Sequence, residues 1–396
     1  MKVEWHDRSS MSSLVPEWDG LAAAAAEPNP YYEHWALLPA LDTCGADVGL
    51  EAAAVRVGGE LAGLFFFEPV ARWRGLPVRA LRAWRSRHML LGTPLVRAGM
   101  EEAAIAALLG ALRERASVVE MPYLHADGPV CRALRAALAS AGRPWHADQG
   151  FERALLRRGA DAEGYLAAAL DGDRRRELRR KEKRLKDAGE VRYVRLGPDG
   201  DVARWIDDFV RIEASGWKAR AGGALACREA DLAFSRALFR GAFERGRLMA
   251  TGLDVDGKAV ARELCLLAGE GAFSVRIAYD EAFARFAPGM LCELENIRAF
   301  HAAPPRLQWM DSYTSAENTT IGRLWKERRR IERLTAAVDG YGAFVLSLLP
   351  WLRRAKETLT SASAALGARA GRTRTASPSS SSPSRTPRTP AGSAPS

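Results

Sequence analysis

Charged residues that interrupt apolar strand patterns are the first candidates for chemistry in this chain of 396 residues. Arg262 and Glu263 stand inside the apolar run 258–267, and Arg276 stands inside the next run, 272–279. Strand side chains alternate between the two faces of a sheet, so such residues point into a cleft or at each other across the ladder. With the turn centred midway between the two runs, Glu263 is predicted to face Arg276.

Two interpretations of this pair remain open. A cross-strand pair of opposite charges contributes roughly 0.2–1 kcal/mol to stability and needs no chemical role. Alternatively, Glu263 is a general base that takes a proton from an attacking amine or hydroxyl. A base needs a raised pKa, and a neighbouring guanidinium lowers it. On the second interpretation Arg276 therefore orients the acceptor or stabilises charge.

Two further residues could serve in proton transfer. Asp311 follows a short predicted strand, 307–310, and polar residues at a strand's carboxyl end often line a cleft. It is the second candidate for general base, with a structural polar cluster as the alternative. Tyr279 ends its strand and is a candidate acid for a leaving group. Its predicted place on the same face as Phe273 favours core packing instead.

A third group of candidates follows a helix that is predicted to begin near Asp201. Glu213, Trp217 and Lys218 fall at its end in the string EASGWKAR. They are candidates for binding an acceptor at the mouth of a cleft. The alternatives are that Trp217 caps the core and that Lys218 complements the negative end of the helix dipole.

Composition excludes several classes of protein. The chain is 47% hydrophobic and 27% charged, which excludes disordered, collagenous and disulfide-scaffold proteins. Of the net charge of +10, +7 lies in residues 351–396, so nucleic-acid binding by the whole chain is not indicated. Five cysteines and six histidines are scattered without a CxxC pair, which predicts no metal site and reduced thiols in the cytoplasm. No signal peptide or spanning segment is expected.

The predicted elements form an α/β (α+β) fold. Strands are expected at 52–57, 61–67, 90–96 and 117–121, then at 247–255, 258–267 and 272–279, with helices at 32–42, 100–115, 128–141 and 290–301. Asp256-Gly257 is typical of a tight hairpin turn, and Gly58-Gly59 joins a similar apolar pair in the first half. This similarity predicts two copies of one unit.

Five strings in order resemble the CelD-like acyltransferases of the GNAT superfamily, which are relatives of the Fem peptidyltransferases. They are NPYYEHWALLPAL (29–41), RRRELRRKEKRL (174–185), EASGWKARAGGAL (213–225), the strand pair with its FARFAPGMLCE extension, and WMDSYTSAENTTIGRLWKERR (309–329). The resemblance implies two GNAT-like halves, 1–150 and 151–345, each a mixed, mostly antiparallel sheet with flanking helices. Residues 346–396 are expected to be a helix end and a disordered basic tail.

The resemblance also implies a donor site. GNAT folds splay two strands, bind the pantetheine of acyl-CoA along the open edge and receive its pyrophosphate at the following helix N-terminus. That place corresponds here to Arg285, Pro288, Gly289 and Met290. The loop departs from the usual Q/R-x-x-G-x-G/A pattern, and Pro288 lacks an N–H group. A plain turn between strand and helix is the structural alternative.

The function implied is transfer of an acyl group, most often acetyl, from acyl-CoA to an amine or hydroxyl of a small molecule, sugar or envelope precursor. Exopolysaccharide biosynthesis in a bacterium is the expected setting. A predicted helix at 173–187 carries nine Lys or Arg residues against four acids. It is either a solvated helix or a surface for an acyl carrier protein or tRNA, and residues 323–330 form a second basic segment. The alternatives are a Fem-like transferase that uses aminoacyl-tRNA and an inactive GNAT-like module that binds an anionic partner.

Overall fold

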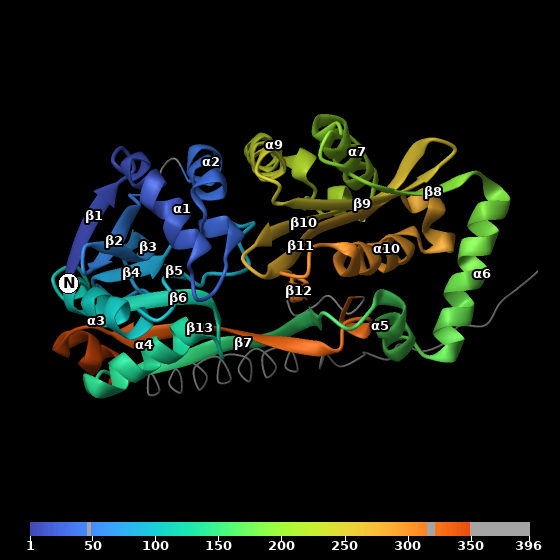
Figure 1. The fold of residues 1–396 in the computed structure, drawn as a ribbon. Coiled ribbons are helices and arrows are strands. Elements are labelled where there is room, and N and C mark those ends of the chain that lie inside the picture. The colour runs from blue at the N-terminus through green and yellow to red at the C-terminus, as the bar shows by residue number, and fades with distance from the viewer. Residues whose placement is uncertain (46–48, 315–320, 349–396) are drawn as a thin grey trace, which may run out of the picture. The chain divides into compact units, whose positions relative to one another are not determined.

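The described residues, 1–45, 49–314 and 321–348, form one 13-stranded mixed sheet in this computed structural model (Figure 1). The strands are β1 (Lys2–Asp7), β2 (Glu51–Val57), β3 (Glu60–Val70), β4 (Ala80–Ala83), β5 (Leu95–Val96), β6 (Val118–His125), β7 (Trp145–Arg157), β8 (Val191–Arg195), β9 (Leu248–Val255), β10 (Lys258–Ala268), β11 (Gly271–Tyr279), β12 (Trp309–Asp311) and β13 (Glu327–Ala337). Their order across the sheet is β1-β2-β3-β4-β6-β13-β7-β12-β11-β10-β9-β8, and β5 pairs with β3.

The strand order contains an internal repeat. Reading inward from each edge, β1-β2-β3-β4-β6-β13 and β8-β9-β10-β11-β12-β7 have the same pairing directions: antiparallel three times, then parallel, then antiparallel. The innermost strand of the first series is β13, which comes from the end of the described sequence. The innermost strand of the second series is β7, which precedes the other strands of that series in the sequence. The boundary predicted at residue 150 falls inside β7, and the division at that position stays a prediction.

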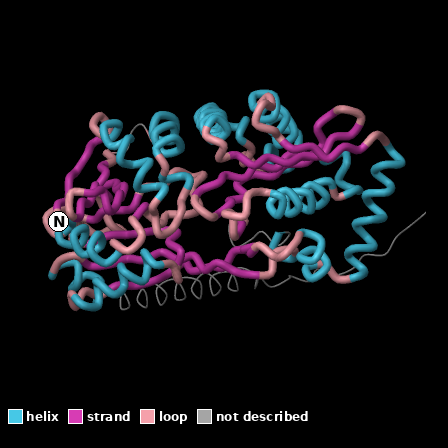
Figure 2. Tube along the Cα trace, in the orientation of Figure 1, coloured by secondary structure: helices cyan, strands magenta, loops and turns pink. Residues whose placement is uncertain are grey.

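Helices cover both faces of the sheet (Figure 2). On one face, α1 (Val15–Ala23), α2 (His34–Cys44), α7 (Val202–Ser215) and α9 (Glu229–Glu244) share a buried apolar cluster. On the other face lie α3 (Glu101–Leu112), α4 (Pro129–Ser140), α5 (Ala162–Ala169) and α10 (Pro288–Ala302). Helices α6 (Gly172–Ala188) and α8 (Trp217–Arg220) belong to the C-terminal half, and residues 340–348 are helical as well. No helix in the described part of the chain has both the length and the apolar character needed to cross a bilayer.

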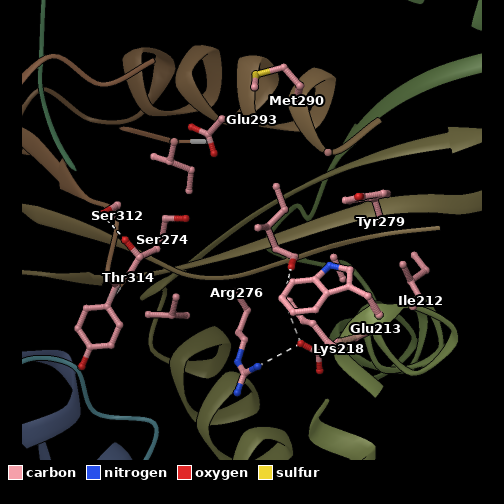
Figure 3. Close-up of a pocket in the computed structure, with 18 of the residues that line it drawn as sticks. Ile212, Glu213, Lys218, Ser274, Arg276, Tyr279, Met290, Glu293, Ser312 and Thr314 are labelled. Carbon is pink, nitrogen blue, oxygen red and sulfur yellow. Dashed lines mark hydrogen bonds and ion pairs between the residues drawn. The ribbon is translucent and has the colours of Figure 1, made fainter. Parts of the chain in front are cut away.

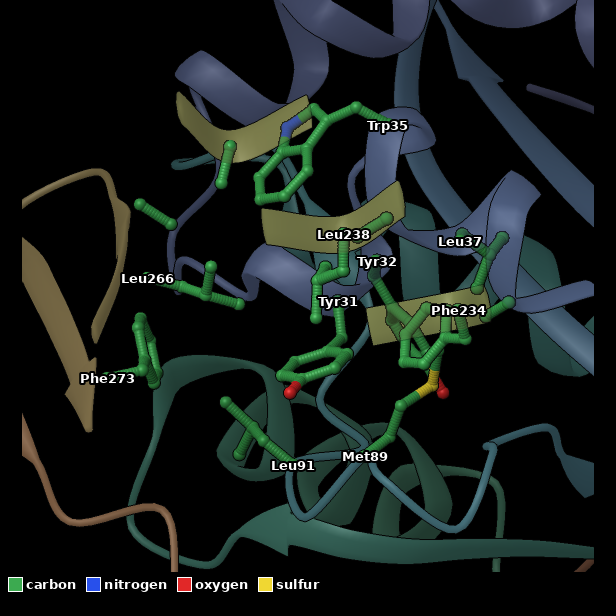
Figure 4. Close-up of a cluster of buried hydrophobic side chains, with 14 of the residues drawn as sticks. Tyr31, Tyr32, Trp35, Leu37, Met89, Leu91, Phe234, Leu238, Leu266 and Phe273 are labelled. Carbon is green, nitrogen blue, oxygen red and sulfur yellow. The ribbon is translucent and has the colours of Figure 1, made fainter. Parts of the chain in front are cut away.

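The cluster on the α7 face joins the two halves (Figure 4). Tyr31 and Trp35 come from the N-terminal half, and Phe234 and Leu238 come from α9. The ring of Phe273 on β11 belongs to the same cluster and is fully buried. Burying side chains of this size contributes about 1.5–3 kcal/mol each, so the halves are held together mainly by apolar contact.

The predicted hairpins are confirmed. Asp256 and Gly257 have φ angles of 51° and 73° and join β9 to β10, because a tight turn between twisted strands needs positive φ at both positions. Gly58 and Gly59, at 61° and 92°, join β2 to β3. Most predicted strands and helices lie within a few residues of the observed ones.

Several elements differ from the prediction. Residues 90–94 are a loop, because only Leu95 and Val96 pair with β3. The second basic segment, 323–330, runs into β13, which begins at Glu327. Strands β1, β4, β7, β8 and β13 have no counterpart in the prediction. Of the helix end and tail predicted at 346–396, residues 349–396 lie outside the described residues.

Candidate functional site

A cavity of about 880 Å³ opens where β11 leaves β12 (Figure 3). Strand β12 pairs with residues 271–273 of β11, and within the described residues the ladder ends there. Strand β11 continues to Tyr279, and residues 274–279 line the cavity. This is the splayed pair that the sequence motifs imply for a donor site. The cavity is closed on other sides by α10, by the α7–α8 junction and by a loop of the N-terminal half that carries His88.

A β-bulge decides which side chains of β11 face which wall. From Cys265 onward the register is the predicted one, with Cys265 opposite Ser274. Between Leu264 and Cys265 the register shifts, so Leu264 lies opposite Arg276. The prediction that Glu263 faces Arg276 is therefore wrong, because a bulged strand carries one extra residue and every later side chain changes face.

The same shift corrects the placement of Tyr279. This residue was predicted to share a face with Phe273. Instead Phe273 packs in the cluster on the α7 face, whereas Tyr279 packs beside Leu291 and Cys292 of α10. Tyr279 is half-buried and lines the cavity, so its role as a proton donor stays a proposal.

Glu263 forms a buried pair with Glu293 of α10. The carboxylate of Glu263 is fully buried, and its Oε1 accepts hydrogen bonds from Ser274 Oγ at 2.7 Å and Asn296 Nδ2 at 2.9 Å. Glu293 Oε1 accepts from Trp325 Nε1 at 2.9 Å. The other oxygen of each carboxyl group, Oε2, is buried without a hydrogen-bond partner, and the two groups lie close enough for each to affect the pKa of the other. Glu293 and Ser274 line the cavity, so the pair reaches the cavity through them.

This pair holds a proton near neutral pH. Burial raises the pKa of Glu263 to about 7. Burial also raises the pKa of Glu293 well above its ordinary value, and the neighbouring charge of Glu263 raises it further. Two carboxylates in contact cannot both ionise cheaply, so they titrate as one unit. A group that gains and loses a proton near pH 7 is suited to general acid–base catalysis.

A charged cluster lies on the other face of β11. Glu213 is buried, and its Oε1 accepts from Arg276 Nη1 at 3.1 Å and from Lys218 Nζ at 3.4 Å. Lys218 Nζ also donates to the carbonyl oxygen of Ile277 at 2.7 Å. Burial lowers the pKa of Lys218. The structure thus brings together three predicted acceptor-binding residues, with Glu213 in the wall rather than at an open mouth.

Trp217 lies at the rim of the cavity. Its side chain is 56% exposed, so the alternative that it caps the core is wrong. The backbone N–H of Trp217 donates to Glu281 Oε1 at 2.6 Å, and Arg220 pairs with the same carboxylate. These contacts fix α8 against the segment after β11 and hold the indole at the rim. An exposed aromatic ring there can pack on the flat face of a ligand.

The N-terminus of α10 forms the far end of the cavity. Gly289 and Met290 line the cavity; the Met290 N–H donates to the Ala287 carbonyl at 3.0 Å, which leaves the Gly289 N–H as the donor available at this end of the helix. Pro288 is buried at the first helical position, where its missing N–H costs nothing. A Cβ on Gly289 would lie 2.9 Å from the Tyr279 ring. Arg285 is exposed over the Phe286 ring and is not among the lining residues.

Asp311 lies outside the cavity lining, in a buried ion cluster. Arg153 of β7 holds both of its oxygens, at 2.7 and 2.8 Å, and Arg329 of β13 donates to Oδ2 at 2.7 Å. Burial alone would raise the pKa of Asp311, but the charges of Arg153 and Arg329 outweigh it and hold the pKa below its ordinary value. A carboxylate with two guanidinium partners is a poor base. This geometry favours the structural alternative for Asp311.

Three residues in or beside the site were not predicted: Glu293, Asn296 and His88. Glu293 and Asn296 stand three residues apart on α10, which is buried almost all round. A carboxyl group in such an apolar helix is a sequence feature that could have indicated a functional role for Glu293. His88 comes from an irregular loop, and nothing in its sequence neighbourhood predicts a place beside β11. Only tertiary structure brings it to Arg276, where its Nδ1 lies 3.1 Å from the guanidinium.

Comparisons with known proteins agree with this geometry. Residues 172–318 match the family model described as the acetyltransferase (GNAT) domain. The crystal structure of FemX aligns with a TM-score of 0.58 at 10% identity, over 87% of this chain and 99% of that chain. A conserved protein of unknown function from Bacteroides thetaiotaomicron VPI-5482 aligns with a TM-score of 0.50 at 14% identity, over 82% and 97%. No curated protein matches the sequence. The fold is therefore that of GNAT acyltransferases.

The carboxyl pair predicts a dependence of stability on pH. Both pKa values are raised in the folded chain. Below the ordinary carboxyl pKa the folded and unfolded chains carry the same charge on these groups, and the folded chain loses stability as pH rises from that value through about 7. Glu293→Gln mimics the protonated form and should flatten the fall in melting temperature between about pH 5 and pH 8. The control Glu102→Gln changes an exposed residue of α3 and should keep the wild-type slope. Equal slopes in both variants would contradict the assignment.

The ion cluster predicts a large loss of stability on removing Asp311. Asp311→Asn leaves Arg153 and Arg329 buried without a counter-charge, which should lower the free energy of unfolding by about 3–5 kcal/mol. Urea unfolding measures the change. Asp173→Asn, at a side chain that is 89% exposed, is the matched control and should unfold as wild type does. Unfolding of Asp311→Asn at the wild-type urea concentration would show that the cluster is not structural.

Proposed function

We propose that the chain is an acyltransferase that moves an acyl group, most often acetyl, from acyl-CoA to an amine or hydroxyl of a small molecule, sugar or envelope precursor. The observation that carries this proposal is the open edge of β11 on a cavity that ends at the N-terminus of α10. Backbone groups of that edge can bind the amides of pantetheine. The N–H group of Gly289 at the positive end of the α10 dipole suits the pyrophosphate, while the Met290 N–H already donates to the Ala287 carbonyl at 3.0 Å.

The reaction is direct transfer in a ternary complex. The acceptor nitrogen or oxygen attacks the thioester carbonyl, the new C–N or C–O bond forms, and the C–S bond breaks. The acceptor's proton passes to the Glu263–Glu293 pair through Glu293 or Ser274, and CoA leaves as a thiolate that takes a proton. Tyr279, which lines the cavity, is the proposed donor of that proton. Backbone N–H groups of the open edge polarise the carbonyl oxygen.

The CelD-like subtype and a role in exopolysaccharide or envelope assembly are part of this proposal and rest on the sequence motifs. The five cysteines are free thiols, which fits a reducing cytoplasm, where acyl-CoA is available. Arg285 is proposed to contact the phosphates from outside the lining. No residue set among those described is proposed to hold a catalytic metal.

The basic helix α6 supports a proposed anionic partner. Arg174 at its first turn lines the cavity, and Arg176, Arg179, Arg180 and Lys183 are exposed along it. A field of this sign steers anionic donors toward the cavity. An acyl carrier protein or a tRNA would meet the same surface. Retention on tRNA that falls steeply with salt would favour aminoacyl transfer over acyl-CoA.

Thermal unfolding of the full chain with acetyl-CoA, CoA and a longer acyl-CoA tests the donor. A ligand at about 100 times its dissociation constant adds about 2.7 kcal/mol to the free energy of unfolding, which is an easily measured shift. A larger shift with one acyl-CoA would identify the donor class. Absence of a shift with all three would contradict the proposal and direct the search to tRNA and carrier proteins.

Glu263→Gln tests the proton acceptor. The variant should keep wild-type acyl-CoA affinity and lose turnover by about 10²–10⁴-fold, because the carboxyl pair can no longer accept the proton. Release of the CoA thiol, measured against a panel of amines and alcohols, reports turnover. Glu102→Gln serves as the control with unchanged release. Wild-type turnover by Glu263→Gln would rule out this base.

A further inference from the structure

The charged cluster on the α7 face of β11 extends beyond Glu213, Lys218 and Arg276. Arg276 Nη2 lies 3.1 Å from His88 Nδ1, and the other side of the His88 ring lies 2.8 Å from Asp231 Oδ1 of α9. Arg87 Nη1 lies 3.0 Å from Asp231 Oδ2. A continuous chain of contacts therefore runs from α9 through the loop of the N-terminal half to the guanidinium in the cavity wall.

The hydrogen bonds assign one tautomer to His88. A guanidinium can only donate, so Nδ1 of His88 accepts from Arg276 and Nε2 carries the ring proton, which it donates to Asp231. Burial lowers the pKa of His88 and favours this neutral form. Cys44 lies close enough to join His88 and Asp231 as a metal-ligand set. The proton on Nε2 occupies the lone pair that a metal needs, so the donor set does not fit a cation.

The cluster carries one positive charge in excess. Three cations face two carboxylates in it, the members being Arg87, Lys218, Arg276, Glu213 and Asp231. The carboxylate side chains are 1% and 4% exposed, and those of Arg276 and Lys218 are 20% and 27% exposed toward the cavity. An excess charge at a partly desolvated surface is stabilised when an anion binds.

We propose that Arg276 and Lys218 form an oxyanion-binding subsite for the acceptor, so that the acceptor is an amine or alcohol that also carries a carboxylate or phosphate. This inference rests on the proposed function. The N-terminus of α10 lies across β11 from the subsite, because α10 and α7 cover opposite faces of the sheet (Figure 1). The subsite is thus separate from the place proposed for the donor pyrophosphate. The guanidinium fork matches a planar oxyanion, and His88 and Asp231 are its positioning residues.

Binding of sulfate and succinate to the full chain tests the subsite. Both probes should raise the melting temperature at constant ionic strength in the presence of saturating CoA, whereas the neutral analogue succinamide should not. Arg276→Gln should weaken both probes by about tenfold or more, since a charge-assisted contact is lost. Arg192→Gln, at an exposed residue of β8 outside the cavity lining, should bind them as wild type does. Equal shifts in Arg276→Gln and wild type, or with succinamide, would overturn the proposal.

Measurement of acyl-CoA binding distinguishes failure of this proposal from failure of the proposed function. Arg276→Gln should bind acyl-CoA with wild-type affinity, and a loss of that affinity would show that Arg276 holds the donor's phosphates, which overturns the acceptor assignment. Displacement of sulfate by CoA in the wild type would do the same. Sulfate binding through Arg276 in a chain that binds no acyl-CoA would contradict the proposed function and still support an oxyanion subsite.

The pH profile of sulfate binding tests the positioning role. Protonation of Nδ1 adds a positive charge, which by itself would raise sulfate affinity, but it also removes the acceptor that holds Arg276. If His88 acts by positioning Arg276, wild-type affinity should therefore fall on the acid side of the ordinary histidine pKa, while sulfate keeps its charge, and a rise would show that only the charge of His88 matters. His88→Asn offers an oxygen where Nδ1 lies and should bind sulfate without this fall, whereas His88→Ala should bind weakly at every pH. Asp231, Arg87, Arg276, Glu213 and Cys44 surround the ring. An unchanged profile in His88→Asn would overturn this role.

Discussion

The place where β12 stops decides the rest of the site. Asp311 is the last residue of this three-residue strand, and its carboxylate is held by arginines of β7 and β13. The Ser312 N–H still donates to the Ala154 carbonyl of β7 at 3.0 Å, and the chain turns away from β11 at Tyr313, whose φ is 49°. If β12 continued, its backbone would pair with residues 274–279 and no open edge would remain. A buried ion cluster outside the cavity lining thus holds the end of β12 at the edge of the cavity.

The same cluster also positions the loop of the N-terminal half. Arg153 donates to the carbonyl oxygen of Leu90 as well as to Asp311. The Leu90 N–H donates to the Tyr313 hydroxyl at 2.9 Å, and the Tyr313 N–H donates to Asp311 at 2.8 Å. His88 stands two residues before Leu90, so these hydrogen bonds fix the segment that carries it to Arg276. Neither half could form this wall alone.

Strand β11 divides the proposed chemistry between two faces. The bulge near Val275 places Arg276 on the α7 face, while Ser274 and Glu263 lie on the α10 face with Glu293. Without the extra residue, Glu263 and Arg276 would lie opposite each other, and the guanidinium would lower the pKa that burial raises. The bulge therefore places the carboxyl pair, which binds a proton near neutral pH, and the cationic cluster on opposite faces of the same strand.

The sequence by itself determined the local elements and most of the candidate residues. Asp256-Gly257 specifies its hairpin because positive φ is a local requirement. Glu213 and Lys218 stand at the end of a predicted helix and Arg276 interrupts an apolar run, whereas Gly289 and Met290 follow from the resemblance to the GNAT donor loop. Tertiary structure alone decided the partners. The bulge shifts the register of β10 and β11 by one residue. Strand β13 pairs with β6 of the first half, and β7 pairs with β12 of the second. Glu293 and His88 reach the cavity from a buried helix and an irregular loop. Those features depend on contacts between residues distant in sequence, and no local pattern of residue types encodes which distant side chain completes a site.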